Sequence, residues 1–200
     1  MLEITKTHSK GKSLGFTLIE LMVTLAIIII IAVVAIPGYA DFQRSSELSS
    51  RTATFISAIN AARGEAMKRG RYAMVVPADG ADWSTGVMAF VDINRDQTFN
   101  AAVDPVIYSN SDAFPAYLGI ASTSGTASLA PPYILFDPQG YPKLKNLTFS
   151  GLTISFARND VSASKIPSQT RRIILSVTGR LRTCTPTSST DTTCQAGSSN

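Results

Sequence analysis

Residues 16–36 read FTLIELMVTLAIIIIIAVVAI, an apolar run that is interrupted by a single charged residue, Glu20. As a helix this run would be roughly 31 Å long at about 1.5 Å per residue, which is enough to cross the hydrocarbon core of a bilayer. Lys6, Lys10 and Lys12 precede the run, and a positive flank of this kind stays on the cytoplasmic side. The sequence therefore predicts an N-terminal membrane helix, with the rest of the chain on the far side of the membrane.

Three interpretations of this N-terminus are open. The run could be a plain single-span anchor. It could also be a secretory signal peptide, cut after a small residue such as Ala32 or Ala35. Against the signal peptide, Val33 and Val34 crowd the cleavage site and the apolar run is long. The third interpretation depends on the residues immediately before the run.

These residues form the junction KSLGFTLIE (residues 12–20), which leads into the unbroken apolar run and then Pro37. The junction closely resembles the class III leader of type IV pilins and of type II secretion pseudopilins. The resemblance implies that a prepilin peptidase cuts after Gly15, that the apolar run is kept, and that the new N-terminal Phe16 is methylated. Residues 1–15 would then be the leader, and residues 16–37 the transmembrane and assembly helix.

Glu20 has a physical role under this interpretation. A carboxylate inside hydrocarbon is costly and needs a partner. Cleavage after Gly15 creates an α-amine at Phe16, and residues i and i+4 lie on one face of a helix. Glu20 could pair with that amine or with the amine of a neighbouring chain; the resemblance implies the neighbour, whose pairing sets the register of assembly. The alternative is that Glu20 simply lies at headgroup level.

A helical pattern resumes after Pro37-Gly38, where the missing backbone donor of proline should bend or loosen the helix. Apolar residues then recur at three- and four-residue steps up to Gly70, a reasonable helix stop. We expect one helix over residues 16–69, amphipathic in its second half (38–70), which therefore needs a sheet to cover it. The apolar stripe consists of Leu48, Thr52, Phe55, Ile56, Ile59, Ala62, Ala66 and Met67.

Only runs with strand character follow, and turn signals separate them. They are Tyr72–Val76, Val87–Val91, Val106–Tyr108, Tyr117–Ala121, Tyr133–Phe136, Leu147–Phe156 and Arg172–Val177. This order predicts an α+β fold in which an antiparallel sheet packs on the amphipathic half-helix, an architecture similar to that of type IV pilins. The β-rich globular domain would span residues 71–184 in the periplasm, and residues 185–200 would be a mobile tail.

The residue inventory argues against catalysis and against a cofactor. The one histidine, His8, lies in the predicted leader, so a mature chain would have no Ser-His-Asp or Cys-His system. Asp92, Asn94 and Asp96 have the spacing of a calcium loop. However, Gln97 stands where such a loop has its turn glycine, and its bidentate Glu is missing. We therefore prefer a polar hairpin loop, with calcium as a weak candidate and no other metal site.

The two cysteines, Cys184 and Cys194, are expected to form a disulfide in a periplasmic segment. Closing a ring of about 11 residues contributes roughly 2.5–3 kcal/mol in the chain-entropy model. The bridge would tie the tail to the end of the last strand. The alternative is two free thiols.

Residues 138–200 contain eight basic and two acidic residues, and include the segment TGRLRTC (178–184). In an extended segment Arg180 and Arg182 point the same way, with their Cα atoms about 6.5 Å apart. Two guanidinium groups at that spacing can each bind a phosphate of one nucleic acid strand. Gly179 permits a sharp turn before them. Four more basic residues could widen the patch: Lys143, Lys145, Arg171 and Arg172.

The Gly-Arg-x-Arg element resembles the DNA-binding motif of FimT-like minor pilins, which take up DNA in natural transformation. The stretch AFVDIN (89–94) is similar to a strand and loop of the GspH/FimT branch, and this resemblance covers most of the chain. It implies a single-pass inner-membrane prepilin that reaches the cell surface in the pilus. Its partners would be the prepilin peptidase, other pilins, the inner membrane and DNA.

Such DNA binding would be non-specific, because phosphate contacts carry no base information. A rival interpretation is a purely structural subunit without a DNA role. It would be a FimU-like minor pilin that primes or caps the pilus, or a GspH-like pseudopilin of type II secretion. In that case the arginines would be ordinary charged residues of an exposed hairpin that help to keep the protein soluble.

Overall fold

The computed structural model describes residues 15–124, 126–191 and 193–194. The chain divides into two units, Met1–Gln43 and Arg44–Asn200, and each is described by itself. The helix α1 (Leu18–Arg69) begins in the first unit and ends in the second. This agrees with the single long helix that the sequence predicts over residues 16–69.

The described part of the first unit is apolar and exposed. Ile30 is 67% exposed and Phe42 is 70% exposed, which is the property of a helix that lipid or other subunits cover. By length and composition, no single helix in the described residues would cross a membrane. The segments Leu18–Val33 and Gly38–Arg69 meet those requirements only as a pair, joined across a bend. The bend falls between Val33 and Gly38, the region in which the sequence predicts that Pro37-Gly38 bends the helix.

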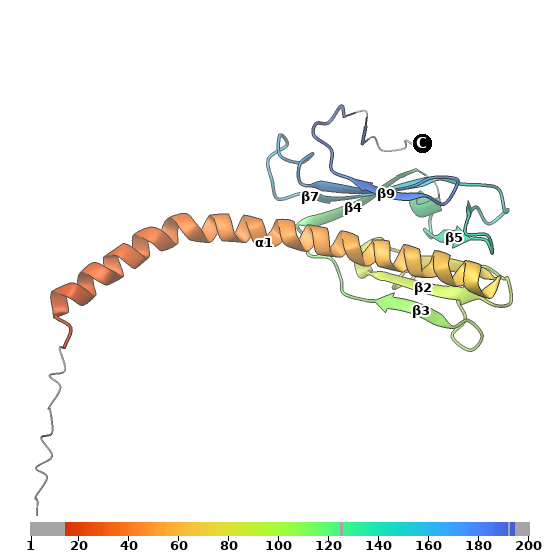
Figure 1. Cartoon of the computed structure of the whole chain (residues 1–200), viewed down its shortest axis with the longest axis horizontal. Coiled ribbons are helices and arrows are strands. Elements are labelled where there is room, and N and C mark those ends of the chain that lie inside the picture. Colours follow the sequence, from red (N-terminus) through yellow and green to blue (C-terminus); the bar gives the residue numbers. More distant parts are fainter. Residues whose placement is uncertain (1–14, 125, 192, 195–200) are drawn as a thin grey trace, which may run out of the picture. The chain divides into compact units, whose positions relative to one another are not determined.

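Two antiparallel sheets make up most of the second unit (Figure 1). Sheet A has the order β3-β2-β1-β5-β6, and sheet B has the order β4-β7-β8-β9. The strands of sheet A are β1 (Tyr72–Pro77), β2 (Val87–Asp92), β3 (Val106–Asn110), β5 (Ile134–Phe136) and β6 (Pro142–Lys143). Those of sheet B are β4 (Leu118–Ser124), β7 (Leu152–Arg158), β8 (Thr170–Leu175) and β9 (Leu181–Cys184). Two short 3₁₀ helices are η1 (Trp83–Thr85) and η2 (Thr126–Ser128).

The sequence-based description of the strands needs three corrections. There are two sheets where one was expected. β7 begins at Leu152, because Leu147 lies in a turn with a φ of 67° that no strand residue adopts. β6 and β9 were missed because they have only two and four residues, too few to show an alternating pattern.

The core lies between the second half of α1 and both sheets. Phe55 of α1 is fully buried, and its ring centroid lies 4.9 Å from that of Phe156 on β7 and 5.5 Å from that of Trp83. The predicted stripe on α1 is largely buried, but Ile56 is half-buried and Met67 is 46% exposed. The architecture is therefore α+β, with the amphipathic half of the helix covered as predicted.

Candidate functional site

Gly179 lies in the turn between β8 and β9, with a φ of +80°. A Cβ atom at this position would lie 2.5 Å from the carbonyl oxygen of Gly140 and 3.1 Å from the guanidinium of Arg63. Gly140 belongs to the turn between β5 and β6, and its carbonyl accepts a 3.0 Å hydrogen bond from Arg63 Nε. Arg63 of α1 therefore joins a turn of sheet A to a turn of sheet B. The glycine of the predicted motif has a packing role.

The two arginines that were expected to act alike are placed differently. The backbone of Arg180 closes the turn, since its N–H donates to Ser176 Oγ at 3.1 Å and its carbonyl accepts from the Ser176 N–H at 3.0 Å. The Arg180 side chain is exposed. Arg182 on β9 is half-buried, and its Nη1 donates to the carbonyl oxygen of Thr193 at 3.2 Å. Arg180 alone of this pair presents an exposed side chain.

Arg171 and Arg172 point to opposite faces of sheet B, because neighbouring residues of a strand alternate. Arg172 is paired in register with Cys184, and its Nη1 donates to the carbonyl oxygen of Cys194. Arg171 donates to the carbonyl oxygens of Ser168 and Thr170, and it lines a groove beside α1. Arg172 thus lies on the face that carries Arg182, whereas Arg171 does not.

The two lysines belong to the region of sheet A. Lys143 on β6 is an ion-pair partner of Asp137 at 3.5 Å, and its Nζ lies 3.2 Å from the centroid of the Phe149 ring. Only 12% of the Lys143 side chain is exposed, so it has little surface to offer a ligand. Lys145 is exposed, with its Nζ 5.3 Å from the centroid of the Tyr133 ring.

Cys184 and Cys194 are joined by a disulfide, with their Cα atoms 5.9 Å apart, as expected. We call residues 185–194 the C-terminal loop. In its described part the carboxylate of Asp191 accepts hydrogen bonds from the N–H groups of Thr187 at 2.9 Å and Thr193 at 2.8 Å. These hydrogen bonds, of which the one from the Thr187 N–H has the largest effect, hold the pKa of Asp191 well below its usual value. These contacts hold the described part of the tail predicted from residue 185; its mobility stays a prediction, and residues 192 and 195–200 lie outside the described residues.

The calcium candidate residues form hydrogen bonds within their own loop, and calcium binding there stays a prediction to be tested. The carboxylate oxygens of Asp96 accept from the Thr98 N–H at 2.9 Å and from the Asn94 amide at 2.7 Å, so the loop uses its own donors. Burial raises the pKa of Asp92, whose Oδ2 accepts from the Gln97 N–H at 3.0 Å. In the described ranges no group of three or more His, Cys, Asp or Glu side chains could hold a metal ion. The polar hairpin loop is the observed arrangement.

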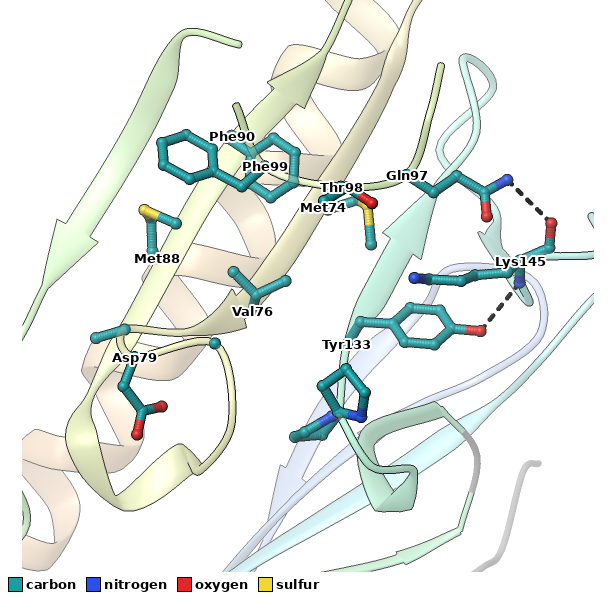
Figure 2. Close-up of a pocket in the computed structure, with 14 residues that line it drawn as sticks. Met74, Val76, Asp79, Met88, Phe90, Gln97, Thr98, Phe99, Tyr133 and Lys145 are labelled. Atoms are coloured by element: carbon teal, nitrogen blue, oxygen red, sulfur yellow. Dashed lines mark hydrogen bonds between the residues drawn. The ribbon is translucent and has the colours of Figure 1, made fainter. Parts of the chain in front are cut away.

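An apolar pocket of about 410 Å³ lies on the face of sheet A that points away from the main core (Figure 2). Its floor includes Met74 and Phe90, and Phe99 packs on Phe90 with ring centroids 5.1 Å apart. At one side the Tyr133 hydroxyl accepts from the Lys145 N–H at 3.0 Å. The pocket is lined mainly by apolar side chains and holds no pair of groups arranged for acid–base chemistry.

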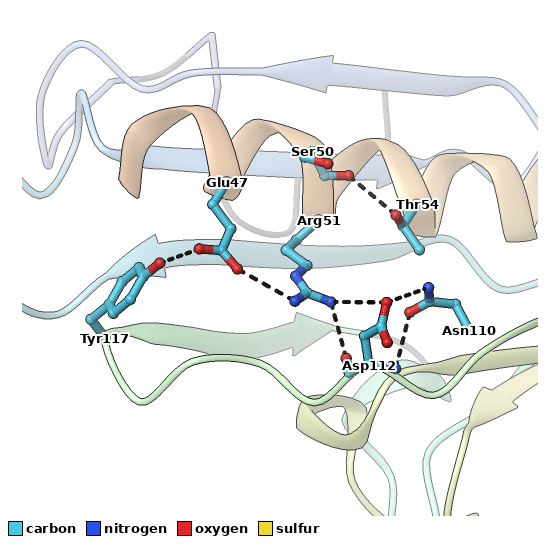
Figure 3. A network of polar contacts seen from close by, with 7 residues as sticks. All are labelled: Glu47, Ser50, Arg51, Thr54, Asn110, Asp112 and Tyr117. Atoms are coloured by element: carbon cyan, nitrogen blue, oxygen red, sulfur yellow. Dashed lines mark hydrogen bonds and ion pairs between the residues drawn. The ribbon is translucent and has the colours of Figure 1, made fainter. Parts of the chain in front are cut away.

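Sequence reasoning missed a polar network that fixes the segment between β3 and β4 to α1 (Figure 3). Arg51 donates to Glu47 at 3.3 Å and to the carbonyl oxygen of Asp112 at 3.2 Å. Glu47 also accepts from the Tyr117 hydroxyl, and this hydrogen bond raises the pKa of Tyr117. The only signal in the sequence was that Glu47 and Arg51 lie off the apolar stripe at an i, i+4 spacing.

A neighbouring cluster centres on Asp160. Arg158 donates two 2.8 Å hydrogen bonds to its carboxylate, and Arg44 of α1 donates one of 2.6 Å. The hydrogen bonds from Arg158 are the main cause that lowers the pKa of Asp160 to about 2. Arg158 is 2% exposed, so Asp160 neutralises a buried charge in sheet B.

Gly15 and Phe16 precede α1, and Phe16 is 79% exposed. The Glu20 N–H donates to Thr17 Oγ1 at 3.2 Å, which places Glu20 in the first turn of the helix. The leader residues 1–14 lie outside the described residues. The cleavage, the methylation and the pairing of Glu20 therefore stay predictions.

Comparisons with known proteins agree with this architecture. Residues 51–179 match the family model described as type II transport protein GspH, and residues 10–36 match the prokaryotic N-terminal methylation motif. A fimbrial protein of Pseudomonas aeruginosa is 42% identical over 57 residues, which are 28% of this chain and 36% of that protein. Fimbrial protein EcpC of Eikenella corrodens is 40% identical over 81 residues, 39% of this chain and 47% of that protein. The chain thus spans between about a third and a half of the length of these relatives.

The crystal structure of the type IV minor pilin FimU of Pseudomonas aeruginosa has the same fold. It aligns with a TM-score of 0.51 at 16% identity, over 74% of this chain and 98% of that one. This confirms the predicted pilin fold. The GspH match ends at Gly179, so the arginines that follow lie outside it.

Pilin-like proteins of this kind are structural subunits and not enzymes, which confirms that prediction. A family match over more than half of the chain, preceded by the methylation motif, shows that this chain belongs to the GspH family.

Proposed function

We propose that this chain is a minor pilin of a type IV pilus and that the edge of sheet B binds the backbone of extracellular DNA. One observation carries the DNA assignment: Arg180 is exposed immediately before β9, and Arg182 of β9 lies on the same face of sheet B as Arg172. Guanidinium groups bind phosphates with two parallel hydrogen bonds. Two of them on one face, with Arg180 in the turn that precedes β9, suit a polyanion better than a single small anion.

The methylation motif and the apolar helix support the route to the filament. The prepilin peptidase cuts between Gly15 and Phe16 and methylates Phe16. Residues 16–37 anchor the subunit in the inner membrane and later pack among other pilins, with Glu20 paired to the N-terminal amine of a neighbour. Residues 38–70 carry the β-rich domain 71–184 and the disulfide-closed segment that follows, first in the periplasm and then on the cell-surface pilus.

A single subunit binds DNA weakly. Of Arg172, Arg180 and Arg182, Arg180 alone has an exposed side chain, and one phosphate contact gives a salt slope of about −1 in log K. Several copies along a filament raise the overall affinity, because each later contact is intramolecular. Phosphate contacts of this kind do not select a base sequence.

The test is fluorescence anisotropy of labelled duplex DNA with the full chain in detergent. Arg180→Gln should remove most of the salt-sensitive binding. Arg171→Gln is the matched control, since it removes the same charge from the opposite face of sheet B. Equal binding by the parent and Arg180→Gln would refute the DNA assignment. Equal losses in the two variants would show only a general effect of positive charge.

A structural role without DNA is the second candidate, in a type IV pilus or in type II secretion. Two observations favour it. The GspH match stops at Gly179, and the packing of Gly179 on Gly140 and Arg63 explains this glycine without a ligand. If Arg180→Gln binds DNA like the parent, this candidate replaces the first.

A further inference from the structure

One face of sheet B carries both the disulfide and two arginines. Arg172 on β8 is paired with Cys184 on β9, and Arg182 is paired with Ile174. Residues 172 and 174 share one face of β8, and residues 182 and 184 share that face of β9. The opposite face holds Ile173, which packs in the main core with α1. The Cys184–Cys194 bond therefore turns the C-terminal loop back over the arginine face.

The segment that directly follows β9, residues 185–191, lies on the side of sheet B away from α1 (Figure 1). Ile174, on the arginine face, is only 1% exposed, and Pro186 of the loop is buried. The middle of this face is thus covered, and Arg172 and Arg182 are half-buried.

The loop occupies the donors that a phosphate would use. Arg182 Nη1 donates to the carbonyl oxygen of Thr193, and Arg172 Nη1 donates to that of Cys194. Within the described part of the chain, Arg172 Nε is buried and has no hydrogen-bond partner. A single carbonyl oxygen leaves this donor unused, whereas a phosphate can accept from Nε and Nη together.

We infer that the C-terminal loop is a cover over a three-arginine phosphate-binding strip, made of Arg172, Arg180 and Arg182, of which only Arg180 is exposed while the loop is in place. The inference rests on the proposed DNA function and adds its regulation. Phosphate oxygens accept stronger, charge-assisted bonds than neutral carbonyls. The disulfide opposes the exchange, because it holds the two carbonyls against the arginines.

Opening the loop should therefore strengthen DNA binding. We would compare the full parent chain in detergent with the double variant Cys184→Ser/Cys194→Ser, using labelled duplex DNA. Two additional phosphate contacts make the salt slope steeper by about 1.8. The advantage of the variant over the parent then shrinks about 12-fold between 50 and 200 mM salt. A second variant, Asp191→Ala, keeps the disulfide but removes the acceptor that organises the loop, and it should shift binding in the same direction.

The matched controls place Arg172→Gln or Arg171→Gln in the double-serine background. Arg172→Gln should abolish the gain, and Arg171→Gln, on the opposite face, should leave it. Arginine modification by a dicarbonyl reagent, mapped by mass spectrometry, gives a readout without DNA. Arg172 should be protected in the parent and reactive in both loop variants.

The outcomes separate the two proposals. If the parent binds DNA and the folded loop variants bind with the same affinity and slope, the cover is refuted and the DNA function stands. Equal reactivity of Arg172 in the parent and the variants also refutes the cover. If Arg172 becomes reactive but no form binds DNA, both the DNA function and its regulation are wrong.

Discussion

Gly179→Ala should destabilise the domain through close packing, and Gly80→Ala should show how much of the cost is backbone strain alone. Both glycines have a φ of +80°, but nothing lies within 4 Å of a Cβ at Gly80. A Cβ at Gly179 would meet the Gly140 carbonyl oxygen at 2.5 Å and the Arg63 guanidinium at 3.1 Å. The pair therefore has equal conformational strain and different packing.

The magnitudes follow from these contacts. An alanine in the left-handed region costs about 1–2 kcal/mol at either position. Overlap with a backbone carbonyl adds about 1–3 kcal/mol, because neither turn can retreat without disturbing its sheet. Moving Arg63 also weakens its hydrogen bond to Gly140, for about 1 kcal/mol. We expect a loss of about 3–6 kcal/mol for Gly179→Ala and about 1–2 kcal/mol for Gly80→Ala.

Denaturant unfolding can be followed by the fluorescence of the one tryptophan, Trp83, which is 4% exposed in the core. The quantity to compare is the free energy of unfolding of each variant against the parent. Equal destabilisation by Gly179→Ala and Gly80→Ala would refute the packing argument. In that case Gly179 would be explained by its positive φ alone or by contact with a ligand.

Three other predictions concern charge, cations and processing. Asp160→Asn should lower stability at pH 7 by about 1–2 kcal/mol, since a pKa near 2 against 3.8 gives at most about 2.4 kcal/mol before solvent screening. That stability is present above pH 3.8 and is lost as the pH falls through 2. The unfolding curves of the parent and the variant should therefore converge in acid. The control variant Asp112→Asn should change the stability little, because the Asp112 side chain is 72% exposed. Calcium should leave the Tm unchanged if the Asp92 loop is only a polar hairpin, and a Tm that rises with calcium concentration would contradict this. N-terminal sequencing should begin at Phe16, Gly15→Val should block maturation, and a mature start at another residue would overturn the assignment.

The helix and most strands could be predicted from the sequence, because burial of one face makes apolar residues recur at the spacing of a helix or of a strand. Phe55 and Ile59 recur at helical spacing and are fully buried. β6 and β9 could not be predicted, since short edge strands carry little apolar pattern. The division into two sheets depends on which strands pair, and pairing is set by tertiary contacts that no local pattern encodes.

The residue types of the candidate site could be predicted, but the exposure and the hydrogen-bond partners of these residues could not. Their two-residue spacing in an extended segment predicted that the side chains of Arg180 and Arg182 point to the same side. It could not show that Arg182 would donate to Thr193, because that contact exists only once the chain has folded back through the disulfide. Likewise, the role of Gly179 depends on Gly140, which is distant in sequence and belongs to the other sheet.

Arg63 makes the two β-turns at this end of the domain mechanically dependent on each other. Its guanidinium lies against Gly179 and is bonded to Gly140, so neither turn can swing outward while the other keeps its place. Their amide protons should consequently exchange with solvent in a single concerted opening, although they belong to separate hydrogen-bond ladders.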